Sequence, residues 1–187
     1  HRSIRRQRQM CIRDRSGACQ IIDFGIASKL HRERHHYKEA SQLQGTLPYI
    51  APEQTGRTNL SVDARSDLYG LGATFFEWLT DTPPFSGDDA AELVHQIIAA
   101  SPKKASEVNA EVPPVIDQIV CKLLNKSPGE RYQTSNGLLH DLKRCSDEYT
   151  KSGSWQSFEL GEFDNSGQFI IPETLYGREA EIATLID

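Results

Sequence analysis

Apolar residues recur at helical spacing through much of the chain between residues 63 and 149. Positions three or four apart share one face of an α-helix, so such a stripe indicates a helix whose apolar face is buried. The stripes consist of Leu68, Leu71, Phe75, Phe76 and Leu79; of Leu93, Val94, Ile97 and Ile98; of Ile116, Ile119, Val120, Leu123 and Leu124; and of Leu138, Leu142, Cys145 and Tyr149. We therefore predict a mainly α fold whose core is formed by these faces.

Signals for helix ends accompany the stripes. Thr82-Pro83-Pro84 follows the first stripe, and proline does not continue a helix because it lacks the backbone N–H donor. Asp89, with Glu92 three residues later, is typical of the start of a helix and precedes the second stripe. Pro113-Pro114 precedes the third, where proline suits the first helical position. These signals predict separate helices joined by short connections.

The flanking regions have different patterns. Cys19-Gln20-Ile21-Ile22 predicts a short strand, and the polar, histidine-rich residues 31–47 predict a long surface loop. From Ser152 the composition shifts to Gly, Ser, Asp and Glu with isolated aromatic residues, so we interpret residues 150–174 as an acidic linker. Residues 175–187 begin a further helical pattern. We expect one compact unit over residues 1–149, a linker, and the start of a second domain.

Charge and composition narrow the classes of function. The 187 residues include 21 Lys and Arg against 26 Asp and Glu, for a net charge of −5, which argues against nucleic-acid binding. No run approaches the eighteen or so apolar residues of a membrane segment. The four cysteines are scattered without CxxC spacing, as in proteins of a reducing compartment, and no apolar stretch follows the basic start. We expect a cytoplasmic location.

Two sequence motifs give the clearest indication of function. The predicted strand runs into Asp23-Phe24-Gly25, and Ala51-Pro52-Glu53 follows 26 residues later, which are the order and separation of a protein kinase activation segment. Further residues that match the protein kinase pattern are Gly45-Thr46, Asp67-Leu68-Tyr69-Gly70-Leu71-Gly72 and Arg131. The chain therefore resembles the C-terminal lobe of a bacterial Ser/Thr protein kinase domain, with a short β-strand before the Asp-Phe-Gly motif.

The resemblance implies roles at the reaction centre. Asp23 matches the carboxylate that binds Mg²⁺, which holds the phosphates of ATP and neutralises developing charge. Phe24 packs against the core to orient this carboxylate, and Gly25 permits the backbone turn. Thr46 matches the catalytic-site hydroxyl that, in Ser/Thr-specific kinases, helps hold the catalytic loop and the substrate hydroxyl together. ATP and Mg²⁺ are thus the implied cofactors, and proteins are the implied substrates.

The resemblance also implies structural roles. Glu53 and Arg131 match the two ends of a buried ion pair that ties the activation segment to the last helices. Asp67 matches the carboxylate that braces the catalytic-loop backbone. Tyr37, Ser41 and Thr46 all carry hydroxyls in the activation segment, and their spacing does not choose among them as phosphorylation sites.

A wider resemblance extends beyond the kinase lobe. Its residues are Ala51-Pro52-Glu53-Gln54-Thr55-Gly56-Arg57, Glu92-Leu93-Val94-His95, Glu130-Arg131-Tyr132-Gln133 and Leu175-Tyr176-Gly177-Arg178-Glu179. These are similar to large bacterial signalling proteins in which a kinase domain precedes an AAA-type ATPase domain, often followed by GAF and histidine-kinase modules. The implied partners are these modules of the same parent chain. Residues 175–187 would begin the ATPase domain, whose GxxxxGK[ST] phosphate-binding loop is not in this sequence.

The N-terminal residues depart from the kinase pattern. Ser3 and Arg8 stand where a kinase carries its catalytic Asp and its metal-binding Asn, and no glycine-rich loop or strand lysine precedes Asp23. Taken literally, these replacements favour a pseudokinase or interaction module. Residues 10–15, MCIRDR, however, resemble a translated transposon end from sequencing-library preparation rather than the strand that should follow a catalytic loop. We therefore interpret residues 1–16 as partly or wholly chimeric, and we expect the 187 residues alone to be inactive.

Overall fold

The structure is a computed structural model that describes residues 10–13, 19–22 and 47–164. Its regular elements are β1 (Met10–Arg13), β2 (Cys19–Ile22), η2 (Leu47–Tyr49), η3 (Pro52–Thr55), α1 (Ala64–Thr80), α2 (Ala90–Ala99), α3 (Ala105–Val108), α4 (Pro114–Leu123), η4 (Pro128–Glu130) and α5 (Ser135–Ser152). The predicted mainly α fold is confirmed, and each of the four apolar stripes lies on a helix or at its end. No helix in the described part of the chain is long and apolar enough to cross a membrane.

Side-chain caps define where the longer helices begin. Asp63 precedes α1 and accepts a hydrogen bond from the backbone N–H of Arg65 at 2.9 Å. Asp89 precedes α2 and accepts from the N–H groups of Ala91 and Glu92, both at 2.8 Å, as its position in the sequence predicted. These carboxylates satisfy N–H groups that have no partner within the helix. At the other end, α1 stops before the predicted proline pair, at Asp81 in a left-handed conformation.

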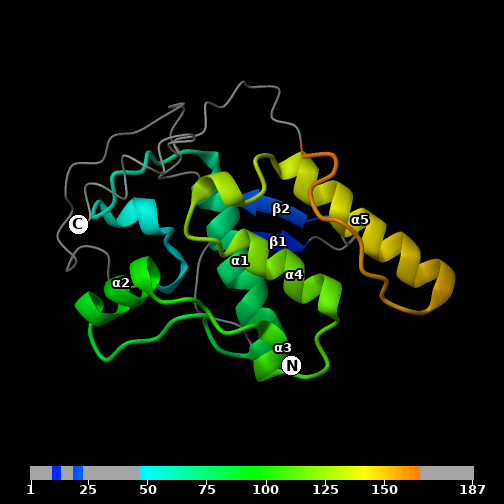
Figure 1. Cartoon of the computed structure of the whole chain (residues 1–187), viewed down its shortest axis with the longest axis horizontal. Coiled ribbons are helices and arrows are strands. Elements are labelled where there is room, and N and C mark those ends of the chain that lie inside the picture. The colour runs from blue at the N-terminus through cyan, green and yellow to red at the C-terminus, as the bar shows by residue number, and fades with distance from the viewer. Residues whose placement is uncertain (1–9, 14–18, 23–46, 165–187) are drawn as a thin grey trace, which may run out of the picture.

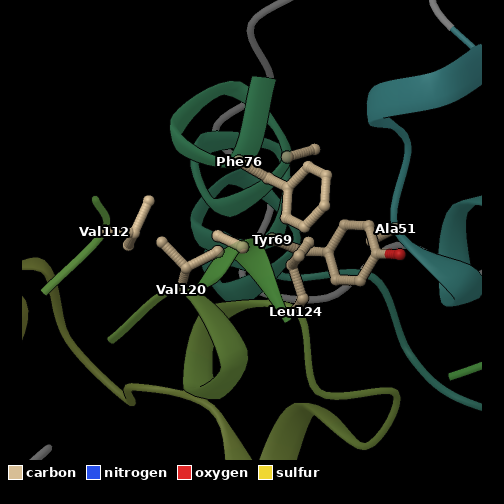
Figure 2. Close-up of a cluster of buried hydrophobic side chains, with 8 residues drawn as sticks. Ala51, Tyr69, Phe76, Val112, Val120 and Leu124 are labelled. Carbon is tan, nitrogen blue, oxygen red and sulfur yellow. The ribbon is translucent and has the colours of Figure 1, made fainter. Parts of the chain in front are cut away.

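Close packing of α1 against α4 forms the centre of the lobe. The two helices approach most closely at Gly72, where an added Cβ would lie 2.6 Å from the Cβ of Leu123. Figure 2 shows the adjoining cluster, in which Tyr69 and Phe76 of α1 lie against Val120 and Leu124. Glycine at position 72 is thus required by the helix crossing, which a side chain would force apart.

Two further clusters extend this core toward opposite sides. One joins α1, α4 and α5 and is built on the buried residues Leu68, Val115, Ile119, Leu123, Tyr132, Leu138 and Cys145. The other surrounds α2 and is built on Leu47, Ile50, Phe85, Leu93, Val94 and Ile97. Accordingly, α2 and α5 lie on either side of the central α1 and α4 (Figure 1). The segment around η2 and η3 is packed into the core by Leu47, Ile50 and Ala51.

The strands form a two-stranded antiparallel sheet. Met10 lies opposite Ile22, and Arg13 lies opposite Cys19. The strand expected at Cys19–Ile22 is confirmed. Residues 10–13 form the preceding strand although their sequence does not resemble the strand expected after a catalytic loop, because a β ladder is made by backbone groups. The interpretation of residues 1–16 as chimeric stays a prediction.

The region expected to be a linker begins inside α5, which continues to Ser152. The chain then turns at Gly153, in a left-handed conformation with φ 66°, and runs back along α5 (orange in Figure 1). Phe158 and Leu160 pack against the core cluster beneath α5. The first part of the expected linker, to Asp164, is therefore packed on the lobe, while residues 165–174 and the helix expected within 175–187 lie outside the described residues.

Candidate functional site: a buried ion pair that anchors the segment ending at Glu53

The structure brings Glu53 and Arg131 together in a buried, two-pronged ion pair. One guanidinium nitrogen of Arg131 donates to Oε1 of Glu53 at 2.6 Å, and the other donates to Oε2 at 2.8 Å. Both side chains are essentially inaccessible, with exposed fractions of 0% and 1% for Arg131 and Glu53. Ser66 of α1 donates a third hydrogen bond to Oε1 at 2.7 Å. The carboxylate is therefore held by charge-assisted hydrogen bonds away from water.

Backbone carbonyls complete the shell around the guanidinium. Arg131 donates to the carbonyl oxygens of Asn125 at 2.7 Å and of Arg65 and Lys126 at 3.1 Å. Its guanidinium carbon lies 4.9 Å from the centre of the Tyr69 ring, a cation–π arrangement. A buried charge without partners would carry a large desolvation cost, and these contacts offset it. The pair thus joins the segment before α1, α1 itself and the loop before α5.

Local structure fixes Glu53 in the required direction. Glu53 lies in η3, and the backbone N–H of Ala51 donates to Oε1 of Gln54 at 2.8 Å at the start of this turn. The hydroxyl of Thr55 donates to the carbonyl of Pro52 at 2.6 Å, and Gly56 ends the turn in a left-handed conformation with φ 70°. These contacts are made within a few residues, so the local turn helps to direct Glu53 toward Arg131.

Asp67 lies in the first turn of α1 and is exposed. Partial burial of the carboxyl raises its pKa above the ordinary value. The catalytic loop that it was expected to brace falls within residues 1–9 and lies outside the described residues. Its bracing role therefore stays a prediction.

The reaction-centre residues expected from the sequence, Asp23, Phe24, Gly25 and Thr46, also lie outside the described residues. Within residues 47–164 and the two strands, the structure contains no group of three or more His, Cys, Asp or Glu side chains that could hold a metal ion. The described site is thus the structural anchor of the predicted kinase lobe.

Contacts around this anchor were not anticipated. The sequence did not predict the hydrogen bond from Ser66 to Glu53, because a single serine in a helix does not indicate which residue it binds.

Two further contacts were also not predicted. The hydroxyl of Tyr49 donates to Glu77, which ties η2 to α1, and the pKa of Tyr49 is raised by burial and by this carboxylate. Lys126 donates to the carbonyl of Ile97 at 2.6 Å and lies 4.0 Å from the centre of the Phe85 ring. Burial and the nearby charge of Arg131 lower the pKa of Lys126 to about 8.

Comparison with known proteins identifies the family. The protein kinase domain family matches residues 1–142, and the chain belongs to this family. Serine/threonine-protein kinase PknB of Mycolicibacterium smegmatis is 39% identical over 131 residues, which cover 70% of this chain and 20% of that protein. A probable serine/threonine-protein kinase of Streptomyces coelicolor is 35% identical over 147 residues, 79% of this chain and 21% of that protein.

A second kind of relative is much longer. Hybrid signal transduction histidine kinase G of Dictyostelium discoideum is 36% identical over 171 residues, which cover 80% of this chain. Peroxide stress-activated histidine kinase mak3 of Schizosaccharomyces pombe is 34% identical over 146 residues, which cover 78%. The matched region spans 5% and 6% of the lengths of these two proteins.

Proposed function

We propose that this chain is part of a Ser/Thr protein kinase that transfers the γ-phosphate of ATP to protein hydroxyls in signal transduction. The observation that carries the proposal is the buried Glu53–Arg131 pair, which anchors the Ala51-Pro52-Glu53 end of the predicted activation segment to the helical lobe. A protein substrate must be held in line with ATP, and a fixed end of this segment supports such positioning.

The proposed chemistry assigns the reaction-centre residues as follows. Asp23 would hold Mg²⁺, a hard cation that prefers carboxylate oxygens, and Phe24 and Gly25 would orient this carboxylate. When bound, the metal would supply positive charge to neutralise the transferring phosphoryl group. Thr46 helps position the Ser or Thr hydroxyl of the substrate. The names of the two shorter relatives, which are both serine/threonine-protein kinases, support this specificity.

The proposed parent is a larger cytoplasmic protein. Two relatives named as histidine kinases share this region within much longer chains, which supports a parent that also carries a histidine-kinase module. The proposed AAA-type ATPase module rests on the resemblance of Leu175-Tyr176-Gly177-Arg178-Glu179. Residues 165–174 would continue the linker, and residues 175–187 would begin the ATPase domain. The 187 residues alone are proposed to be inactive, because they contain no glycine-rich loop to close over ATP.

The test begins with long-read sequencing of the native gene upstream of the codon for Gly17, followed by expression of the complete kinase domain. We expect Mg²⁺-dependent transfer of labelled phosphate from ATP to Ser or Thr peptides and loss of that transfer in Asp23→Asn. Asp81→Asn is a matched control, because it removes the same carboxylate charge at the C-terminal end of α1, at the opposite end of the helix from Ser66, which binds Glu53. Phosphorylation confined to Tyr peptides, or none at all from the folded domain, would contradict the proposal.

The alternative is a pseudokinase module that relays signals to a downstream ATPase domain. Ser3 and Arg8, at the positions of the catalytic Asp and the metal-binding Asn, favour it. The same sequencing separates the two proposals. His-Arg-Asp followed five residues later by Asn favours the active kinase, whereas Ser3 and Arg8 in the native gene favour the pseudokinase.

A further inference from the structure

We propose that residues 153–164 form a strap that is coupled to the Glu53–Arg131 pair, with Asp164 as its fastening point. The strap begins at Gly153, where the chain reverses, and ends at the N-terminal end of α5 (Figure 1). The whole strap lies beyond residue 142, where the match to the kinase family ends. The strap is thus an addition to the matched domain rather than one of its elements.

Aromatic and apolar contacts hold the middle of the strap. Trp155 stacks on Tyr149 of α5, with ring centres 4.6 Å apart. The guanidinium of Arg144 lies 4.2 Å from the centre of the Phe158 ring, and Leu160 packs with Phe158 on the core. Phe158 and Leu160 thereby bury apolar surface against the core cluster beneath α5, and the ring contact of Trp155 adds a partly exposed attachment.

A buried carboxylate holds the strap near its end. Asp141 is 1% exposed and accepts hydrogen bonds from the backbone N–H of Gly161 at 2.8 Å and from the hydroxyl of Tyr132 at 2.7 Å. Both bonds reach the same oxygen. Since an unpaired buried carboxylate is costly, Asp141 stabilises the strap in its place beside α5.

Asp164 fastens the strap to the start of α5. Its carboxylate accepts from the backbone N–H of Gln133 at 2.6 Å, from the N–H of Thr134 at 2.9 Å and from the hydroxyl of Thr134 at 2.9 Å. The same hydroxyl accepts from the N–H of Gly137 at 2.9 Å and so caps α5. Gly137 leaves room for this contact, because a Cβ there would lie 2.3 Å from Oδ1 of Asp164. A negative charge at a helix N-terminus is also favoured by the helix dipole.

Gln133 connects this fastening point to the anchor. While its backbone N–H binds Asp164, its side-chain oxygen accepts from the guanidinium of Arg65 at 2.9 Å, and its amide nitrogen donates to the carbonyl of Arg131 at 2.7 Å. The carbonyl of Arg65 in turn accepts from Arg131, whose guanidinium holds Glu53. A contiguous hydrogen-bonded path therefore runs from the strap to the segment that ends at Glu53, and displacement of Asp164 should loosen the whole path.

Hydrogen exchange followed by NMR on the full 187-residue chain tests the coupling. In Asp164→Asn we expect exchange at the N–H groups of Gln133 and Thr134 to rise about tenfold, as for loss of charge-assisted hydrogen bonds. The coupling predicts that exchange at the Nη1–H group of Arg131, which binds Glu53 and the carbonyl of Arg65, also rises, by about threefold or more. Glu162→Gln is the matched control: it removes one negative charge from the same strap, where Glu162 pairs with Arg144 at 3.6 Å at the surface. It should leave Arg131 unchanged.

A second variant displaces Asp164 without removing its charge. Gly137→Ala favours the helix by propensity but places a methyl group against the Asp164 carboxylate. If the proposal holds, this variant reproduces the exchange pattern of Asp164→Asn, including the change at Arg131. Faster exchange confined to residues 133–137 in both variants, with Arg131 as in the unmodified chain, would overturn the coupling.

Discussion

Two arginine–glutamate pairs in this lobe each place the guanidinium over an aromatic ring but differ in burial. Arg131 pairs with Glu53 and lies over the Tyr69 ring, while Arg144 pairs with Glu148 at 3.1 Å and lies over the Phe158 ring. The first pair is inaccessible, whereas the side chains of the second are 37% and 29% exposed. The same chemistry therefore acts in two different dielectric surroundings.

The difference shows why the distance between two charges does not by itself predict how much an ion pair contributes to stability. Arg144 and Glu148 are one helical turn apart, and water solvates either partner when the other is removed. Arg131 and Glu53 are distant in sequence, and each would remain buried without the other. The buried pair therefore makes folding of the lobe conditional on both partners, and the exposed pair does not.

The largest effect is expected for Glu53→Gln, which preserves shape but removes the charge that faces Arg131. The guanidinium stays buried without a counter-charge, so the free energy of unfolding should fall by about 3–5 kcal/mol. Urea unfolding of the 187-residue chain measures this. A loss below about 1 kcal/mol would contradict the comparison.

The double variant should lose less free energy of unfolding than the sum of the losses in the two single variants. In Glu53→Leu with Arg131→Met no unpaired charge remains, but the carbonyls of Asn125, Arg65 and Lys126 lose their donor. We expect a residual loss of about 1–3 kcal/mol, as for buried polar groups left unpaired. A double-mutant cycle by urea unfolding measures the coupling, and simple additivity would show that the two side chains act independently.

The Asp63–Arg65 pair is intermediate, with both side chains 19% exposed and a contact of 2.6 Å. Burial opposes ionisation of Asp63, but hydrogen bonds and charge from Arg65 outweigh it and lower the pKa below its ordinary value of 3.8. The resulting stabilisation is present above that value and is lost as the pH falls through the folded-state pKa. We expect Asp63→Asn to lower stability by up to about 1 kcal/mol at pH 7 and to flatten the acid limb of the stability curve. Chemical denaturation between pH 2 and 7, in roughly one-unit steps, measures both effects.

The smallest effect is expected for Glu148→Gln in the partly exposed pair on α5. An i, i+4 pair in contact with water contributes about 0.3–0.5 kcal/mol, and added salt should reduce this further. Thermal unfolding at low and high salt detects the difference. A loss as large as that for Glu53→Gln would remove burial as the explanation of the comparison.

The sequence by itself determined the four longer helices and the side-chain cap of α2. The apolar stripes predicted the regions of α1, α2, α4 and α5, because a helical period is set by local geometry. Asp89 could be recognised as a cap for the same reason, since it binds N–H groups two and three residues away. The motifs around Glu53 and Arg131 also indicated the kinase family, which the match over residues 1–142 establishes.

Only the tertiary structure decided which elements depend on distant partners. Helix α3, of four residues, is too short to show a period; Asp117 of α4 holds it by accepting from the N–H of Ala105 at 2.8 Å and from the hydroxyl of Ser106 at 2.6 Å. The Gly- and Ser-rich residues after Ser152 predicted a linker, but contacts with Asp141 and the start of α5 order them as far as Asp164. Composition predicts whether a segment is ordered in isolation. Helix α3 and residues 153–164 are instead ordered by Asp117 and Asp141, which only the folded chain places beside them.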